Sequence, residues 1–150
     1  MGFIMNGFSN SLGVLDKLVA ALNAHDIDAV VACFAEDYRN RTPAHPDRGF
    51  VGRDQVRSNW IQIFAGVPDI TAAVTRATVD GSQVWSEWVM TGARADAQLF
   101  DMRGVILFEI PAQSIQSATL YLELVDMSGE GPDQGVRSVL AAPPHSKEQS

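Results

Sequence analysis

The order of two hydrophobic periodicities constrains this chain more than any other feature. Up to about residue 66, apolar residues recur every three to four positions, a spacing typical of amphipathic helices. From about residue 70, runs rich in Val, Thr and aromatic residues alternate with turn signals, as β-strands do. Helices first and consecutive strands afterwards predict an α+β domain, in which the helices cover one face of a mostly antiparallel sheet.

Three helices are expected in the first part of the chain. The first spans about residues 10–24. The second follows Asp26, a residue type that caps helix N-termini, and carries Phe34 on its apolar side. The third opens near residues 52–54 and stops at Gly66-Val67-Pro68, because glycine accepts the left-handed cap and proline cannot continue a helix.

The strands and the domain boundary follow from the second part. Asp80-Gly81 is a hairpin signal, because turns of this kind need positive φ. Beyond Met127 the composition shifts to Gly, Pro, Ser and charge. We therefore expect one domain over residues 1–127 and a largely mobile extension over 128–150. The expected strands lie at 70–79, 83–92, 100–110 and 114–125, and a helical turn is expected at 136–140.

Composition excludes several classes of function. The net charge of −7, without a cluster of Lys and Arg, argues against nucleic acid and acidic membranes as partners. No segment approaches the roughly 20 apolar residues of a membrane span, and the N-terminus lacks the basic flank of a signal peptide. A single cysteine, Cys33, excludes an internal disulfide, and three dispersed histidines do not suggest a metal site. We expect a cytoplasmic protein without metal or cofactor.

Six short segments stand in an order that is informative together: Leu18 to Asp26, Phe34-Ala35-Glu36-Asp37, Gly52 to Arg57, Val67-Pro68-Asp69, Asp80-Gly81 and Tyr121-Leu122-Glu123. In this order they resemble the SnoaL-like, or nuclear-transport-factor-2-like, superfamily. The resemblance implies a cone: a curved, mixed, mostly antiparallel sheet of cystatin-like type packed against three N-terminal helices. It also implies that the cone encloses a small apolar organic ligand and that the chain pairs as a homodimer through the outer face of the sheet.

The catalytic residues of two family branches do not carry over. Where ketosteroid isomerases place a Tyr and two Asp, this chain has Leu18, Thr42 and Ile106. These side chains cannot accept a proton at neutral pH, so isomerase chemistry by that route is not expected. Limonene-type epoxide hydrolases match better in one place, because their water-holding Tyr-x-Asn resembles Tyr38-Arg39-Asn40. Their acid and base are missing here, with Trp88-Val89-Met90 and Leu120 at those positions.

Apolar candidates come from the strands and the third helix. Alternation places Trp88 and Met90 on one face of their strand. In members of the family that this chain resembles, the corresponding face of the strand looks into the cone. Ile106 and Phe108 on the next strand and Trp60 on the third helix join them as candidate ligand contacts or as core residues. Trp85 and Glu87 then face outward, where a dimer would form.

Polar candidates are few. His45 lies in a Pro-containing loop near the expected opening of the cone, and its imidazole titrates nearest to neutral pH. Tyr121 and Glu123 share one face of the last strand and would line the opening if that face looks inward, whereas one bulge would reverse it. We predict His45, Tyr38 and Glu123 as catalytic candidates, with Asn40 and Tyr121 as ligand contacts.

Two functions stay open at this point. The first is a cofactor-free cyclase, hydratase or isomerase that acts on a polyketide-, terpenoid- or steroid-like molecule. The second is a non-catalytic, dimeric binding or accessory module of the same fold. The Tyr38 and Asn40 pair favours the first, and the missing acids favour the second.

Overall fold

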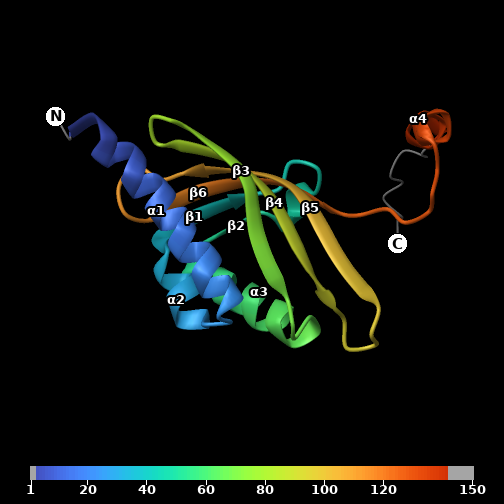
Figure 1. Cartoon of the computed structure of the whole chain (residues 1–150), viewed down its shortest axis with the longest axis horizontal. Coiled ribbons are helices and arrows are strands. Elements are labelled where there is room, and N and C mark those ends of the chain that lie inside the picture. Colours follow the sequence, from blue (N-terminus) through green and yellow to red (C-terminus); the bar gives the residue numbers. More distant parts are fainter. Residues whose placement is uncertain (1–2, 142–150) are drawn as a thin grey trace, which may run out of the picture.

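The computed structural model describes residues 3–141, and the side chains of residues 10–141. Helices α1, α2 and α3 cover one face of a single curved sheet, while α4 stands apart from it (Figure 1). This is the predicted α+β arrangement. The elements, in chain order, are α1 (Phe3–Asn23), α2 (Ile27–Ala32), β1 (Phe34–Arg41), the 3-10 turn η1 (Pro46–Arg48), β2 (Phe50–Val51), α3 (Arg53–Gly66), β3 (Thr71–Asp80), β4 (Gln83–Ala93), β5 (Leu99–Glu109), β6 (Ile115–Leu124) and α4 (Pro132–Ala141).

The sheet has six strands in the order β2-β1-β6-β5-β4-β3. β3, β4, β5 and β6 form a continuous antiparallel meander, and β2 is antiparallel to β1. Only β1 and β6 run parallel, so the sheet is mixed and mostly antiparallel, as expected. The long strands β4 and β5 pair without a break in register from Gln83↔Glu109 to Ala93↔Leu99. One face of this pair lies over the helices (Figure 1).

The prediction for residues 34–41 was wrong. The sequence suggested that the second helix includes Phe34 and that a loop follows, but this segment is the strand β1. Phe34 and Tyr38 point into the core, whereas the charged residues between them are exposed. The strand exists because it pairs with β6, at Arg39↔Ser117 for example, about 80 positions later in the chain. A short polar segment gives no local signal for such a distant pairing.

The hairpin between β3 and β4 forms at the predicted place with a shifted loop. Asp80 still pairs with Gln83, so the two loop residues are Gly81 and Ser82. Gly81 has φ +60°, a conformation that glycine adopts without steric cost.

His25 lies at the junction of α1 and α2. It is half-buried and has φ +53°. Its Nε2 lies 2.8 Å from the Ile70 carbonyl oxygen, and its ring stacks on Phe64 at 4.7 Å between centroids. A ring nitrogen that faces a carbonyl must carry the hydrogen, so His25 donates this bond. The contact ties the start of β3 to the helices.

The C-terminal extension contains more helix than predicted. α4 spans ten residues and includes the expected turn at 136–140. Val136, Val139 and Leu140 are exposed on it. Of the extension that we expected to be largely mobile, residues 142–150 lie outside the described residues. Within residues 3–141, no helix combines the length and the apolar character that crossing a membrane requires.

A cavity beneath the curved sheet as the candidate functional site

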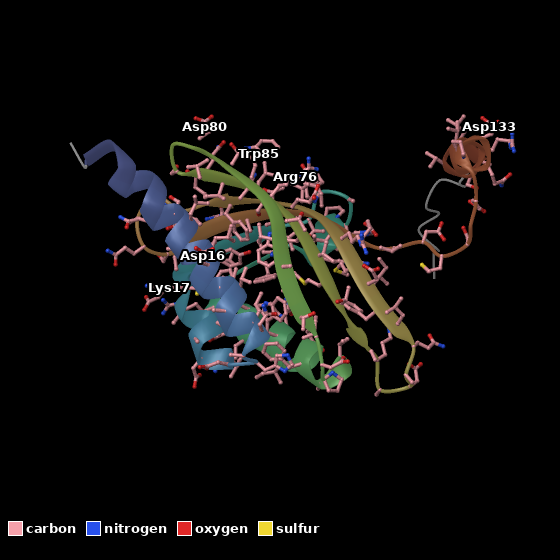
Figure 2. All side chains as sticks on the ribbon, in the orientation of Figure 1. Asp16, Lys17, Arg76, Asp80, Trp85 and Asp133 are labelled. Atoms are coloured by element: carbon pink, nitrogen blue, oxygen red, sulfur yellow. The ribbon has the colours of Figure 1, made fainter. Side chains whose placement is uncertain are left out.

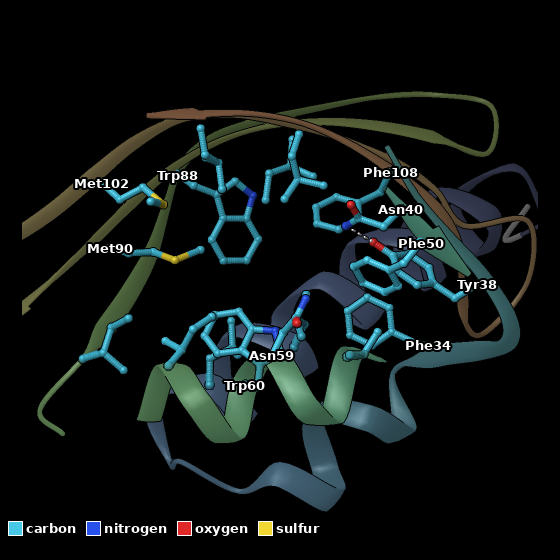
Figure 3. Close-up of a pocket in the computed structure, with 18 of the residues that line it drawn as sticks. Phe34, Tyr38, Asn40, Phe50, Asn59, Trp60, Trp88, Met90, Met102 and Phe108 are labelled. Atoms are coloured by element: carbon cyan, nitrogen blue, oxygen red, sulfur yellow. Dashed lines mark hydrogen bonds between the residues drawn. The ribbon is translucent and has the colours of Figure 1, made fainter. Parts of the chain in front are cut away.

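The inner face of the sheet and the helices α1 and α3 enclose a cavity of about 290 Å³ (Figure 3). This volume lies near the lower end of the range for small-molecule sites. Most of its walls are aliphatic, aromatic or thioether side chains. The lining residues are Leu18, Leu22, Phe34, Tyr38, Asn40, Phe50, Val56, Asn59, Trp60, Ile63, Ile70, Trp88, Met90, Phe100, Met102, Ile106, Phe108, Leu120 and Leu122.

The five apolar residues predicted from the strands and the third helix all lie at this cavity. Trp88, Met90, Ile106 and Phe108 come from β4 and β5 and are at most 6% exposed, and Trp60 reaches the cavity from α3. Two adjacent strands bring them together because even-numbered residues of both face the helices.

Two hydrogen bonds hold the Trp88 indole in place. Its Nε1–H donates to Ser86 Oγ at 2.8 Å, and the Ser86 hydroxyl donates to the Ile106 carbonyl oxygen at 2.8 Å. Both side chains are almost fully buried, at 1% and 2% exposure. A buried N–H without a partner would be costly, so this pair fixes the indole against its own strand and presents its apolar ring to the cavity.

Gly104 brings the backbones of β5 and β6 close together. It pairs with Trp88 across β4 and β5 and has φ +150°. A Cβ atom at this position would overlap the Tyr121 carbonyl oxygen on β6. Glycine is therefore required by backbone conformation and by the close approach of the neighbouring strand.

Tyr38 and Asn40 form the polar part of the wall on β1. Asn40 Nδ2 donates to Tyr38 Oη at 3.1 Å, and Thr42 Oγ1 donates to Asn40 Oδ1 at 3.4 Å. Tyr38 is only 2% exposed, and burial raises its pKa to about 12, although the Asn40 hydrogen bond opposes the shift. The hydroxyl therefore stays protonated near neutral pH. Both predicted residues lie at the cavity.

Asn59 is a polar lining residue that sequence reasoning missed. Gln55 Nε2 donates to its Oδ1 at 2.8 Å, one helical turn away on α3. Figure 3 shows the Asn59 amide on α3 directed into the space that Tyr38 and Asn40 face from β1. The available signal was its position directly before Trp60 and four residues before Ile63, at the edge of the apolar stripe.

Three predicted site residues lie elsewhere. β6 pairs with β5 in unbroken register, which turns Leu120 and Leu122 inward and leaves Tyr121 half-exposed on the outer face. The inward orientation considered for Tyr121 and Glu123 is therefore wrong. His45 also lies outside the cavity lining, and its Nε2 is 2.9 Å from Glu123 Oε1 in a pair open to solvent.

The outer face of the sheet carries an apolar patch, formed by Trp85, Val105, Leu107 and Tyr121. The register places Trp85 opposite Leu107 and Val105 opposite Tyr121, so the four residues are contiguous over β4, β5 and β6. Trp85 is 47% exposed and projects away from the helices (Figure 2), as predicted.

Glu87 also faces outward, as predicted. Arg76 Nη2 donates to its Oε2 at 2.6 Å and Thr75 Oγ1 to its Oε1 at 2.6 Å. The Arg76 hydrogen bond, followed by that of Thr75, lowers the pKa of Glu87. This carboxylate is an ionised surface group and not a base at the cavity.

The cavity contains donors and apolar surface but no carboxylate or imidazole among its lining residues. Within the described part of the chain, no three His, Cys, Asp or Glu side chains gather as metal ligands. Cys33 is buried, and burial raises the pKa of its thiol. The neutral thiol packs as a small hydrophobic side chain and is not an activated nucleophile. The arrangement can hold an apolar molecule and donate hydrogen bonds to it.

The fold and this cavity define a helix-covered α+β cone, and sequence comparison gives the family. The model of the SnoaL-like domain matches residues 15–117. The chain belongs to the SnoaL-like family. The search among curated proteins gave no match.

Solved structures show the same fold at low sequence identity. IdmH from Streptomyces antibioticus, proposed to be a polyketide cyclase, is 18% identical, with a TM-score of 0.66 over 75% of this chain and 91% of that one. A proposed SnoaL-like polyketide cyclase from Jannaschia sp. CCS1 is also 18% identical, with a TM-score of 0.66 over 91% and 94%. A Catenulispora acidiphila protein with a ketosteroid isomerase-like fold, in complex with trimethylamine, is 20% identical, with a TM-score of 0.63 over 71% and 82%.

Proposed function

We propose that this protein binds a small, largely apolar organic molecule in the cavity beneath the sheet. Trp60, Trp88, Met90, Ile106 and Phe108 would supply the apolar contacts, and Tyr38 with Asn40 the polar one. The single observation that carries the proposal is an apolar cavity with one buried tyrosine hydroxyl in its wall. A cytoplasmic location belongs to the proposal and is tested by cell fractionation.

The arrangement favours electrophilic assistance over proton abstraction. Tyr38 keeps its proton at neutral pH and can stabilise negative charge that develops on a ligand oxygen. Cyclisation, hydration or isomerisation of a polyketide-, terpenoid- or steroid-like substrate would use such a donor. The proton-transfer role of His45 and Glu123 remains a prediction, which turnover assays of His45→Gln and Glu123→Gln test. Their pair lies outside the lining residues, so a substrate would have to reach it there.

Binding of indane, a bicyclic hydrocarbon, tests the proposal. NMR titration of the labelled full chain should give saturable shifts at β4, β5 and α3. Leu120→Trp places bulk at the cavity and should weaken binding at least about tenfold, because the space for the ligand is lost. Absence of saturable shifts in the unmodified chain would contradict the proposal.

A matched control lies one residue further along β6. Tyr121→Trp introduces the same indole on the outer face, away from the cavity. Indane should bind this variant with the affinity of the unmodified chain. Equal weakening by both substitutions would show that the titration reports general destabilisation.

A second candidate function is a dimeric accessory module, which the outer apolar patch favours. We propose a second copy of this chain as its occupant, related by a two-fold axis along β5. Such an axis would set Arg39 on β1 of one copy over Asp80 on β3 of the other, because β1 and β3 each lie two strands from β5. Arg39 and Asp80 are exposed and have no ion-pair partner among the described residues.

Sedimentation equilibrium tests this dimer. The unmodified chain should sediment as a dimer, and Trp85→Glu should give a monomer, because it buries a charge in the apolar patch. Ile61→Glu is the control, since Ile61 is a similarly exposed apolar residue on α3. A monomeric unmodified chain would exclude this function. If Trp85→Glu loses both dimerisation and indane binding, the two proposed functions are linked.

A further inference from the structure

Each polar lining side chain carries N–H or O–H hydrogens, while its oxygen already accepts one hydrogen bond from another residue. The Tyr38 oxygen accepts from Asn40, the Asn40 oxygen accepts from Thr42, and the Asn59 oxygen accepts from Gln55. No described residue accepts a hydrogen bond from the Tyr38 hydroxyl or from the Asn59 amide. The cavity therefore presents donors that a ligand can satisfy and no charged acceptor.

The two donor groups belong to opposite walls. Tyr38 is on β1, and Asn59 is on α3, which crosses beneath the sheet. Figure 3 shows both groups facing the same interior space. The Gln55 hydrogen bond fixes the orientation of the Asn59 amide, because it holds the amide oxygen on the helix side and leaves the NH2 for the cavity.

We infer that the ligand is an apolar molecule with an acceptor oxygen of the carbonyl type. Tyr38 Oη–H and Asn59 Nδ2–H hold this oxygen from opposite walls of the cavity. The inference rests on the proposed binding function. A sp² oxygen has two lone pairs and can accept from both groups. Asn59 is then a specificity-determining residue, which selects a ketone, aldehyde or ester over the corresponding hydrocarbon.

The lining residues include no carboxylate or imidazole that could act as a general base. Two neutral donors polarise a carbonyl and stabilise an enol or enolate oxygen, but they do not remove a proton. A ligand whose only polar group is a donor, such as an ammonium group, would find no charged acceptor on the lining residues. The same donors that strengthen binding of a carbonyl therefore do not pair with a ligand that carries only hydrogen-bond donors.

A matched ligand pair provides the test. Indane and 1-indanone have the same bicyclic skeleton and differ by one carbonyl group. The measured quantity is the ratio of their dissociation constants, which cancels the apolar contribution. Because one hydrogen bond changes affinity roughly three- to tenfold, Tyr38→Phe and Asn59→Leu should each shift the ratio against indanone by that factor. Gln62→Leu, on an exposed part of α3, should leave the ratio unchanged.

The carbonyl stretch of bound indanone gives an independent readout. It should move to lower frequency on binding to the unmodified chain, and should move less in Tyr38→Phe and in Asn59→Leu. A purely structural role of Asn59 would leave the frequency in place. An unchanged ratio and frequency in Asn59→Leu, with indane still bound, would overturn this inference alone. Failure of both ligands to bind would overturn the proposed function as well.

Discussion

Replacement of Ser86 by alanine probes the interior of the sheet through one buried hydrogen bond. The Ser86 hydroxyl accepts from Trp88 Nε1 and donates to the Ile106 carbonyl oxygen, and both side chains are almost fully buried. Ser86→Ala leaves the indole N–H without a partner in an apolar wall. A buried unsatisfied donor costs about 1–3 kcal/mol, so we expect a loss of about 2 kcal/mol in the free energy of unfolding.

Urea unfolding followed by far-UV circular dichroism measures this loss. The slope with urea should stay constant, because the surface exposed on unfolding does not change. In a thermal scan, about 2 kcal/mol corresponds to a fall in Tm of roughly 4–8 °C for a domain of this size. Ser58→Ala, at an exposed position of α3, should change the free energy by less than about 0.5 kcal/mol.

A double-mutant cycle isolates the hydrogen bond. Trp88→Phe removes the N–H but keeps an aromatic ring, so in this background Ser86→Ala should cost about 1–2 kcal/mol less than in the unmodified chain. A loss below about 0.5 kcal/mol in Ser86→Ala, or additive effects in the cycle, would refute the reasoning. The indole would then be held by packing alone.

Three further predictions concern backbone, pH and domain boundary. Gly104→Ala should cost at least about 2 kcal/mol in the same urea assay, because φ +150° and the nearby Tyr121 carbonyl leave no place for a Cβ atom; a loss below 1 kcal/mol would contradict this. The pKa of Tyr38 is about 12 in the folded chain and about 10 in the unfolded chain. This difference contributes about 2–3 kcal/mol to the free energy of unfolding as long as the hydroxyl is neutral in both states. The contribution is complete below about pH 10 and is lost as the pH rises toward about 12. Urea titrations between pH 9 and 11.5 should therefore show a steeper decline for the unmodified chain than for Tyr38→Phe, and parallel declines would argue against this burial. A chain that ends at Met127 should keep its cooperative unfolding, whereas loss of the transition would mean that the extension belongs to the domain.

The fold was largely predictable because its signals are local. The stop of α3 comes from glycine followed by proline, and the β3–β4 turn forms around Gly81, within one residue of the expected place. The strands β3 to β6 were recognised from their composition to within one residue at each end. The strand β1 was not predicted, because it consists mostly of charged and polar residues and is stabilised by pairing with β6, which is distant in the sequence.

The candidate site was predictable where strand alternation decides it. Alternation placed Trp88 and Met90 on one face of β4, and the family resemblance indicated that this face looks inward, where both residues lie at the cavity. The same argument failed for Tyr121, since the phase of β6 depends on its register with β5. Asn59 was missed because a single asparagine at the edge of an apolar stripe looks like an exposed polar residue, and only the three-dimensional structure shows what it faces.

Crystals of the full chain under xenon pressure test the central claim most directly. Xenon occupies apolar cavities that are wide enough for it and needs no chemical match. We expect an anomalous-scattering peak between Trp60, Trp88 and Met90, which vanishes in Leu120→Trp. A xenon-free interior with side chains packed through this volume would contradict the account.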